Sequence, residues 1–156
     1  MLFFAADSSP RLQKSKYAPT KMIMFKQFQS FQLKKIDTAK FVMSAVELKD
    51  YIDFEVKRVY FITGIKAPTG AHCHKIEEEF FVLQQGSCTA VIDLGNGLEE
   101  IKMEGPTSAV YVPSLVWHHF KDFSPDAVLL ALSSTNYSPD RSDYVEDYAE
   151  FKKLTQ

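Results

Sequence analysis

Short stretches that alternate apolar and polar residues recur along most of this 156-residue chain, and turn residues separate them. Residues 56–63 are one such stretch, rich in the β-branched and aromatic side chains that strands favour. Residues 95–97 and 105–106 are two of the turns between them. Many short strands at a spacing of roughly ten residues are typical of a β-sandwich or barrel. The other expected strands cover residues 41–43, 71–74, 79–84, 87–94, 99–103, 108–112, 116–120 and 127–133.

The N-terminal part of the chain does not follow this pattern. Residues 1–21 lack apolar periodicity, so we expect a flexible arm or a mis-assigned start. Residues 23–25 open the first segment that we expect to be ordered, and residues 22–156 are expected to form a single domain. A helical turn is expected at residues 47–52.

The C-terminal segment, residues 141–154, is expected to form a helix with Ser142 as its N-cap. Tyr144, Tyr148 and Phe151 recur at helical spacing, which predicts an apolar stripe packed against the barrel.

Composition narrows the classes of partner. The hydrophobic fraction of 46% and the charged fraction of 24% are ordinary for a globular protein. A net charge of −2 gives no electrostatic reason to expect nucleic acid, and no apolar run reaches the roughly 18 residues of a membrane span. Cys73 and Cys88 lie at a spacing that fits no zinc or redox motif, so a cytoplasmic location is expected.

Histidines supply the main functional signal. His72 and His74 stand two residues apart on an expected strand, so both imidazoles should enter the same volume. A carboxylate, Glu79, and a third histidine, His118, follow at the start and in the middle of later strands. A single buried histidine is usually a core residue whose ring nitrogens are hydrogen-bonded. Three histidines together with a carboxylate favour a functional site instead.

The spacing of these residues resembles the two cupin motifs. His72, His74, Glu79 and Gly86 match the first motif, and the segment from Pro113 to His118 matches the second, with Leu115 in place of its glycine. This resemblance implies an all-β fold: a cupin, that is, a double-stranded β-helix or jelly-roll barrel, with a short C-terminal helix.

A narrower resemblance extends over about 100 residues. The matching segments are residues 54–60, 70–75, 86–88, 111–113, 116–118 and 122–124. They are similar to the WxcM-like nucleotide-sugar 3,4-ketoisomerases, which act on dTDP-4-keto-6-deoxyglucose in the synthesis of deoxysugars for bacterial surface polysaccharides. The resemblance implies an isomerase that binds a nucleotide sugar and forms a homodimer.

The resemblance also implies roles for individual residues. His72 and His74 match the family's catalytic pair, which works without a metal or other cofactor, and Tyr60 is expected beside them as a third catalytic residue. Histidine suits the reaction because moving a ketone from C4 to C3 needs a base with a pKa near neutrality. The expected substrate-binding residues are Arg58, Lys75, Tyr111 and His118.

Three positions depart from the family where a cation would bind the diphosphate. The chain has Thr69, Thr89 and Ala39 there, and Arg58, Lys40 and Lys66 are the candidate substitutes.

Two further hypotheses come from different functional classes. Glu79 stands where metal-dependent cupins place a carboxylate ligand, so His72, His74, Glu79 and His118 could hold one divalent transition metal ion. The missing cations are also compatible with a non-catalytic cupin that binds a sugar or nucleotide.

Residues 80–83 are apolar on both faces of their expected strand, which favours a homodimer interface.

Overall fold

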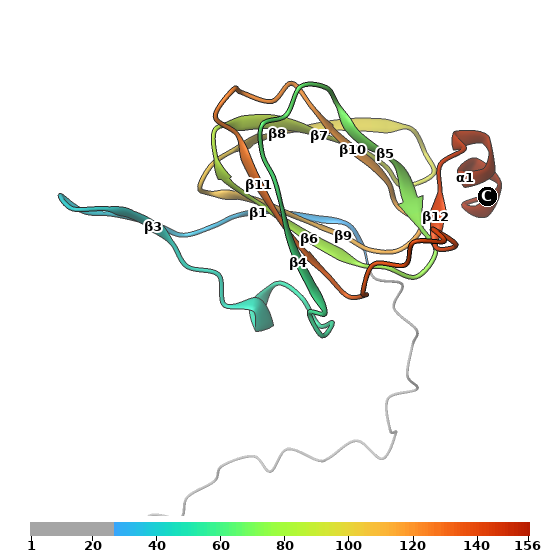
Figure 1. The fold of residues 1–156 in the computed structure, drawn as a ribbon, viewed down its shortest axis with the longest axis horizontal. Helices are drawn as coiled ribbons and strands as arrows, with labels where there is room; N and C mark the ends of the chain where they lie inside the picture. The colour runs from blue at the N-terminus through green and yellow to red at the C-terminus, as the bar shows by residue number, and fades with distance from the viewer. Residues whose placement is uncertain (1–26) are drawn as a thin grey trace, which may run out of the picture.

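The structure, a computed structural model, describes residues 27–156, so the expectations for residues 1–21 and 23–25 lie outside the described part of the chain. Two five-stranded antiparallel sheets face each other and form a barrel (Figure 1). The first sheet has the order β1 (Gln29–Gln32), β9 (Ser108–Val112), β6 (Glu79–Gln85), β11 (Val128–Ser133) and β4 (Arg58–Ile62). The second has the order β12 (Tyr144–Val145), β5 (Thr69–His74), β10 (Trp117–Lys121), β7 (Ser87–Asp93) and β8 (Leu98–Glu104). The all-β jelly-roll expectation is confirmed.

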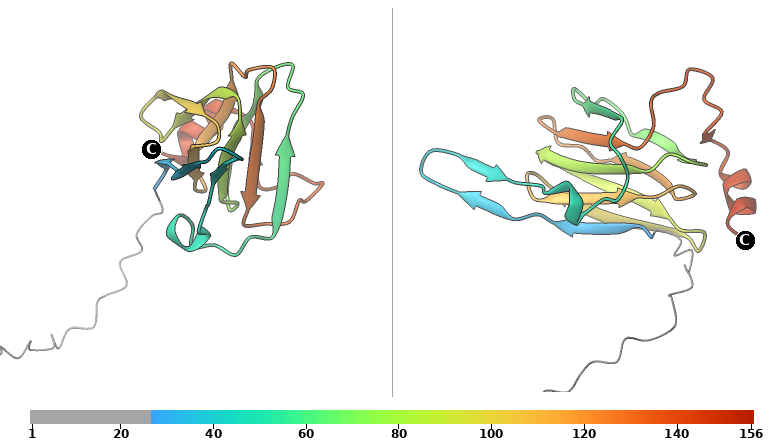
Figure 2. Two further views of the ribbon diagram at one scale, coloured as in Figure 1. Left: turned by 90° about the vertical axis from the view of Figure 1, so that its left-hand side faces the viewer. Right: turned by 90° about the horizontal axis from the view of Figure 1, so that it is seen from below.

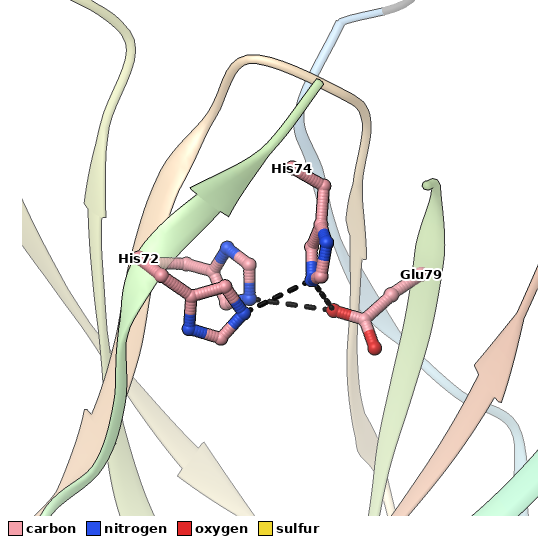
Figure 3. Close-up of side chains that lie close together, drawn as sticks. His72, His74 and Glu79 are labelled. Atoms are coloured by element: carbon pink, nitrogen blue, oxygen red, sulfur yellow. Dashed lines mark hydrogen bonds and ion pairs between the residues drawn. The ribbon is translucent and has the colours of Figure 1, made fainter. Parts of the chain in front are cut away.

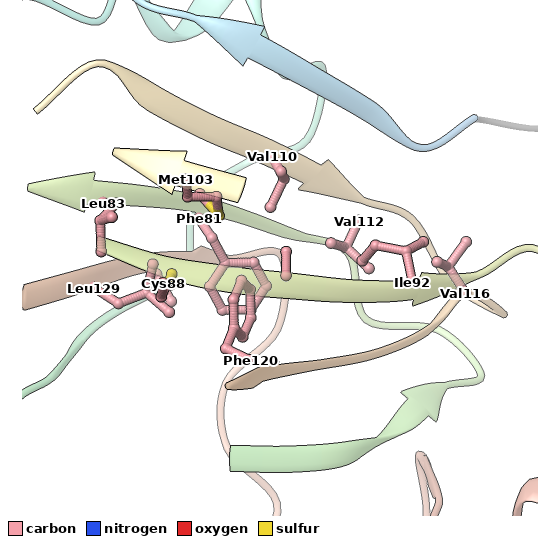
Figure 4. Packing of buried hydrophobic residues seen from close by; sticks show 12 residues of the cluster. Phe81, Leu83, Cys88, Ile92, Met103, Val110, Val112, Val116, Phe120 and Leu129 are labelled. Carbon is pink, nitrogen blue, oxygen red and sulfur yellow. The ribbon is translucent and has the colours of Figure 1, made fainter. Parts of the chain in front are cut away.

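The main core lies between the two sheets (Figure 4). Side chains that alternate along the strands meet there, among them Phe81 from β6 and Phe120 from β10, whose ring centroids lie 4.8 Å apart. Burial of these apolar groups is the main favourable contribution to folding.

The outer face of β6 carries a second apolar cluster. Phe80 and Val82 are buried there, against Leu33 and the partly buried side chains of residues 46–56. This segment contains the short 3-10 helix η1 (Leu48–Asp50), where the expected helical turn is found. The chain itself therefore covers the two-sided strand, and a homodimer is not needed to explain its pattern.

The C-terminal segment differs from the expectation. Residues Tyr144–Val145 form β12, which pairs with β5, and the helix α1 begins only at Tyr148 and ends at Leu154. The N-cap is Asp147 rather than Ser142, because its side chain accepts hydrogen bonds from two backbone N–H groups of the first turn.

The helix covers the outer face of the second sheet. Phe151 is fully buried against Trp117, and the Tyr148 ring also packs on Trp117. These two residues of the expected stripe therefore pack on the barrel, whereas Tyr144 points elsewhere. No helix in residues 27–156 is long and apolar enough to cross a membrane.

A two-stranded hairpin stands away from the barrel. It consists of β2 (Lys35–Asp37) and β3 (Val42–Ser44), which pair only with each other in the described part of the chain. Figures 1 and 2 show it projecting beyond the sheets. The sequence pattern indicated β3 but neither β1 nor β2.

Candidate active site

The two sheets bring the predicted histidines and the carboxylate together inside the barrel. His72 and His74 come from β5, and His118 lies beside His72 on the neighbouring strand β10. Glu79 is the first residue of β6 in the opposite sheet. Figure 3 shows His72, His74 and Glu79 pointing toward one another.

Glu79 is a buried carboxylate with only 2% of its surface exposed. Its Oε1 accepts a hydrogen bond of 2.6 Å from the Tyr60 hydroxyl. Its Oε2 lies 3.3 Å from Nε2 of His118 and 3.5 Å from Nε2 of His74. Burial alone would raise the pKa of Glu79, but the hydrogen bonds and charges of the two imidazoles outweigh it and hold the pKa well below its usual range. Glu79 is therefore charged.

His74 faces hydrogen-bond acceptors at both ring nitrogens. Its Nδ1 lies 3.0 Å from Oδ2 of Asp143, and its Nε2 lies 2.9 Å from Nε2 of His72. Burial lowers the pKa of His74, but the carboxylates of Glu79, Glu77 and Asp143 together raise it above its ordinary value. The surroundings of His74 thus favour the imidazolium form, which can donate from both nitrogens.

The pKa of His72 is shifted in the opposite direction from that of His74. Burial, and then the electrostatic effect of the neighbouring imidazoles of His118 and His74, lower its pKa from 6.5 to about 3. At neutral pH, His72 therefore carries a lone pair on the Nε2 that faces His74. Two neighbouring titratable groups with pKa values driven apart are candidates for a general acid and a general base.

A second buried carboxylate, Glu77, faces the Nδ1 side of His74, away from His72. Glu77 lies 3.6 Å from Nδ1 of His74 and is held by Arg58 and the Ser133 hydroxyl. Arg58 is therefore committed to an ion pair and does not line the cavity. Its guanidinium lies 5.3 Å from the ring centroid of Tyr60, so Arg58 contacts a residue of the cavity wall without lining the cavity itself.

His72 and His118 line a cavity of about 250 Å³ that opens between the sheets, and His74 lies directly behind His72. Tyr60, His72, Glu79 and His118 are among its walls. Burial, followed by the charge of Glu79, raises the pKa of the Tyr60 hydroxyl well above its ordinary range, so Tyr60 stays protonated as a donor. A cavity with convergent polar groups and perturbed pKa values is the expected form of an active site.

Besides Arg58, two more of the expected substrate-binding residues lie outside this cavity. Lys75 follows His74 and is exposed, and its Nζ donates to the backbone carbonyl of Ser142 at 3.3 Å. Tyr111 belongs to the outer cluster, where its ring stacks on Phe54 and its hydroxyl donates to Glu78. In both cases the alternation of side chains along the chain directs the residue away from the histidines.

The sequence pattern missed Tyr144 and Asp143. The Tyr144 ring packs against both imidazoles, with centroids 4.9 Å from His72 and 4.4 Å from His74. Asp143 accepts from the backbone N–H groups of Ile76 and Glu77 as well as facing His74. Both residues lie in the segment expected to be helical, and only their pairing with β5 places them here.

The donor atoms of the site also fit a divalent metal ion. One ligand atom from each of His72, His74, Glu79 and His118 can be chosen so that all lie within 4.8 Å of one another. The second ring nitrogen of each histidine is hydrogen-bonded, to Asp143 for His74, to the Val116 carbonyl for His118 and to the Gly70 backbone for His72. Metal-binding histidines almost always have such a partner.

The chain is similar to known proteins over most of its length. The family model described as "FdtA: WxcM-like, C-terminal" matches residues 26–156. The chain is 40% identical over 122 residues to the TDP-4-oxo-6-deoxy-alpha-D-glucose-3,4-oxoisomerase of Aneurinibacillus thermoaerophilus, a match that covers 77% of this chain and 86% of the relative.

Solved structures of related enzymes share the fold. The TDP-quinovose 3,4-ketoisomerase WlaRB of Campylobacter jejuni has a TM-score of 0.72 and 31% identity, with 83% of this chain and 99% of that chain covered. The sugar 3,4-ketoisomerase QdtA of Thermoanaerobacterium thermosaccharolyticum, in complex with TDP, has a TM-score of 0.74 and 27% identity, with 85% and 96% covered.

The lowered pKa of His72 predicts a specific pH dependence of stability. As the pH falls below the unfolded value of 6.5, the unfolded chain takes up a proton that folded His72 takes up only near pH 3. The free energy of unfolding should therefore fall between these two values. His74, with its raised pKa, contributes stability that is fully present below pH 6.5 and is lost only at higher pH.

Urea unfolding of the wild type and of His72→Asn at pH 6.5 and at about pH 5 measures this contribution. The variant should lose less stability than the wild type over this interval. An equal loss in both proteins would show that His72 does not resist protonation in the folded state.

Proposed function

The chain belongs to the FdtA family (WxcM-like, C-terminal) and is a sugar 3,4-ketoisomerase, and we propose that its substrate is TDP-4-keto-6-deoxyglucose or a closely related keto-deoxysugar nucleotide. The observation that carries the proposal is the contact between two imidazoles whose pKa values are shifted in opposite directions, 2.9 Å apart at their Nε2 atoms. The name of the curated relative supports the substrate.

This pair supplies what the isomerisation requires. Neutral His72 takes the proton from C3, which the neighbouring C4 carbonyl acidifies, while the His74 imidazolium gives a proton to the C4 oxygen. The product of this step is a neutral enediol. His72 then returns its proton to C4, and His74 takes the proton of the C3 hydroxyl, which leaves a ketone at C3. Both histidines end in their starting protonation states, so no other reactant is needed.

The surrounding residues hold this arrangement. Asp143 fixes the ring of His74 and stabilises its positive charge, and the ring of Tyr144 packs against both imidazoles. Tyr60 donates a hydrogen bond from its hydroxyl to Glu79 at the cavity wall, where the hydroxyl oxygen can also accept a hydrogen bond from a sugar hydroxyl.

Proton exchange with deuterated water tests the proposal. Wild-type protein should introduce solvent deuterium into TDP-4-keto-6-deoxyglucose at C3, and into the product at C4. His72→Asn and His74→Asn should each lower the rate by about 10² to 10⁴ because a general acid or base is lost. Binding of TDP should persist in both variants.

His119→Asn is the matched control, because His119 lies next to His118 but does not line the cavity. It should exchange at the wild-type rate. A wild-type protein that exchanges no deuterium into any TDP-keto-sugar would contradict the isomerase proposal. If such a protein still bound TDP, it would be a binding module.

A metal-dependent enzyme is the second candidate, favoured by the hydrogen-bonded second nitrogen on each of the three rings. The ligands would be His72, His74, Glu79 and His118. When bound there, a divalent transition metal supplies a Lewis acid for a carbonyl oxygen. The two candidates exclude each other, because a lone pair that binds a metal cannot also take a proton from C3.

Glu79→Gln distinguishes the two candidates. In the metal-free isomerase it should keep most of the exchange activity, because Asp143 and Glu77 still support the His74 imidazolium. In a metalloenzyme it removes the anionic ligand, so the bound metal per subunit should fall. Elemental analysis of purified protein and thermal shifts with zinc or nickel chloride measure this directly. Stoichiometric metal that is lost in Glu79→Gln would overturn the metal-free account.

We propose that the protein is a homodimer in which the β2–β3 hairpin contacts a second copy. The hairpin exposes Phe41, Val42 and Met43 and pairs with no other strand among residues 27–156. A two-stranded hairpin is marginally stable by itself in water, so a covering surface is expected. The edge strand β4 exposes Val59 and Phe61, which form an apolar surface of the kind that a second copy could cover.

Light scattering at micromolar concentration tests the dimer. The wild type should have the mass of two chains, and Val42→Asp should shift it toward one chain. Leu98→Asp is the control, since Leu98 is equally exposed but lies on β8 at the edge of the other sheet. A monomeric wild type would contradict the proposal.

We infer a reducing compartment such as the cytoplasm from the two cysteines. Cys73 and Cys88 are both buried and free, and burial raises the pKa of their thiols to about 11 and about 12. We also propose that the product enters the synthesis of deoxysugars for surface polysaccharides.

A further inference from the structure

The cavity contains very little positive charge for a substrate that carries a diphosphate. Among the described residues that line it, Arg141 is the only arginine or lysine. We propose that Arg141 binds the diphosphate of the nucleotide sugar and so takes the place of cations missing elsewhere in this chain. The inference rests on the proposed substrate class, and it names the residue that recognises the charged part of that substrate.

Arg141 and the two histidines contact the same aromatic ring. Its guanidinium carbon lies 3.9 Å from the ring centroid of Tyr144, and the same ring packs on His72 and His74. A single aromatic ring therefore separates the cation from the acid and base pair. In a nucleotide sugar the diphosphate is attached at C1 of the ring whose C3 and C4 react, so a cation is needed one sugar ring away from the histidines.

The loop holds Arg141 in an unusual backbone conformation. Its φ is 52°, in the left-handed region that residues other than glycine, asparagine and aspartate rarely adopt. The turn is closed by a hydrogen bond from Arg141 N to the Ser138 carbonyl and one from Tyr144 N to the Arg141 carbonyl. The side chain of Asp140 also accepts from Ser142 N. Such strained residues concentrate at functional sites.

Arg141 has an internal partner in the free protein. Its guanidinium forms an ion pair with Glu146, another residue of the cavity wall, and both side chains are substantially exposed, by 42% and 63%. Exposed ion pairs of this kind contribute little to stability. A diphosphate, with more charge and a geometry that suits the guanidinium fork, can replace the single carboxylate of Glu146 at small cost.

The other candidate cations lie away from the cavity. Arg58 is bound to buried Glu77, and Lys75 donates to the Ser142 carbonyl. Thr69 lines the cavity without a charge, while Thr89 is buried in the second sheet and hydrogen-bonded to Asp122 and Lys102. Within residues 27–156, Arg141 is therefore the cation best placed for the diphosphate.

Calorimetric titration with TDP and with thymidine isolates the diphosphate contribution. Arg141→Ala should weaken TDP binding by about 10-fold, the effect of losing a charged hydrogen bond, and leave thymidine binding unchanged. Arg141→Lys should lie between the wild type and Arg141→Ala, because it keeps the charge without the fork. Glu146→Gln should strengthen TDP binding, since it removes the competing carboxylate.

Lys153→Ala is the matched control, an exposed cation on α1 that does not line the cavity, and it should bind TDP as the wild type does. In the exchange assay, Arg141→Ala should raise KM for the TDP-keto-sugar with little change in kcat. Arg141-dependent TDP binding without any exchange would refute the proposed function and leave this inference standing. Unchanged TDP binding in Arg141→Ala, an equal loss of thymidine binding, or a wild type that binds no TDP would each overturn it.

Discussion

Two imidazole nitrogens that face each other at 2.9 Å can share only one proton, and the rest of the site decides which ring holds it. Three carboxylates surround His74, since Asp143 and Glu77 face its Nδ1 and Glu79 faces its Nε2. Burial and two neighbouring imidazoles act on His72 in the opposite sense. The asymmetry needs no metal and no unusual residue, because it follows from where the acidic side chains lie.

The barrel produces this asymmetry by joining segments that are distant in the sequence. A strand from one sheet supplies both histidines, the first residue of β6 in the other sheet supplies Glu79, and the loop after β11 returns Asp143 to the far side of His74. Because each group is fixed by strand pairing or by backbone hydrogen bonds, the site is formed before any substrate arrives. The same return of the chain places Tyr144 against the imidazoles and Arg141 at the cavity wall.

Local rules were sufficient to predict much of this arrangement. The alternation of a strand puts His72 and His74 on one face, and the motif spacing adds Glu79 and His118. Those rules could not find Asp143, Tyr144 or Arg141, because the 141–154 segment has a helical period in its aromatic residues. Its pairing with β5 across about 70 positions is a tertiary effect that overrides this pattern. Tyr111 illustrates the reverse error, since a motif match does not reveal which face of its strand a residue occupies.

Nitrogen-15 NMR of the histidine side chains at neutral pH tests the central claim most directly, because it reports the protonation state of each ring nitrogen. Spectra of the wild type, assigned with His72→Asn and His74→Asn, should show both nitrogens of His74 protonated and His72 neutral. A neutral His74 beside a protonated His72, or two neutral rings whose nitrogens respond to removal of a metal ion, would contradict the account.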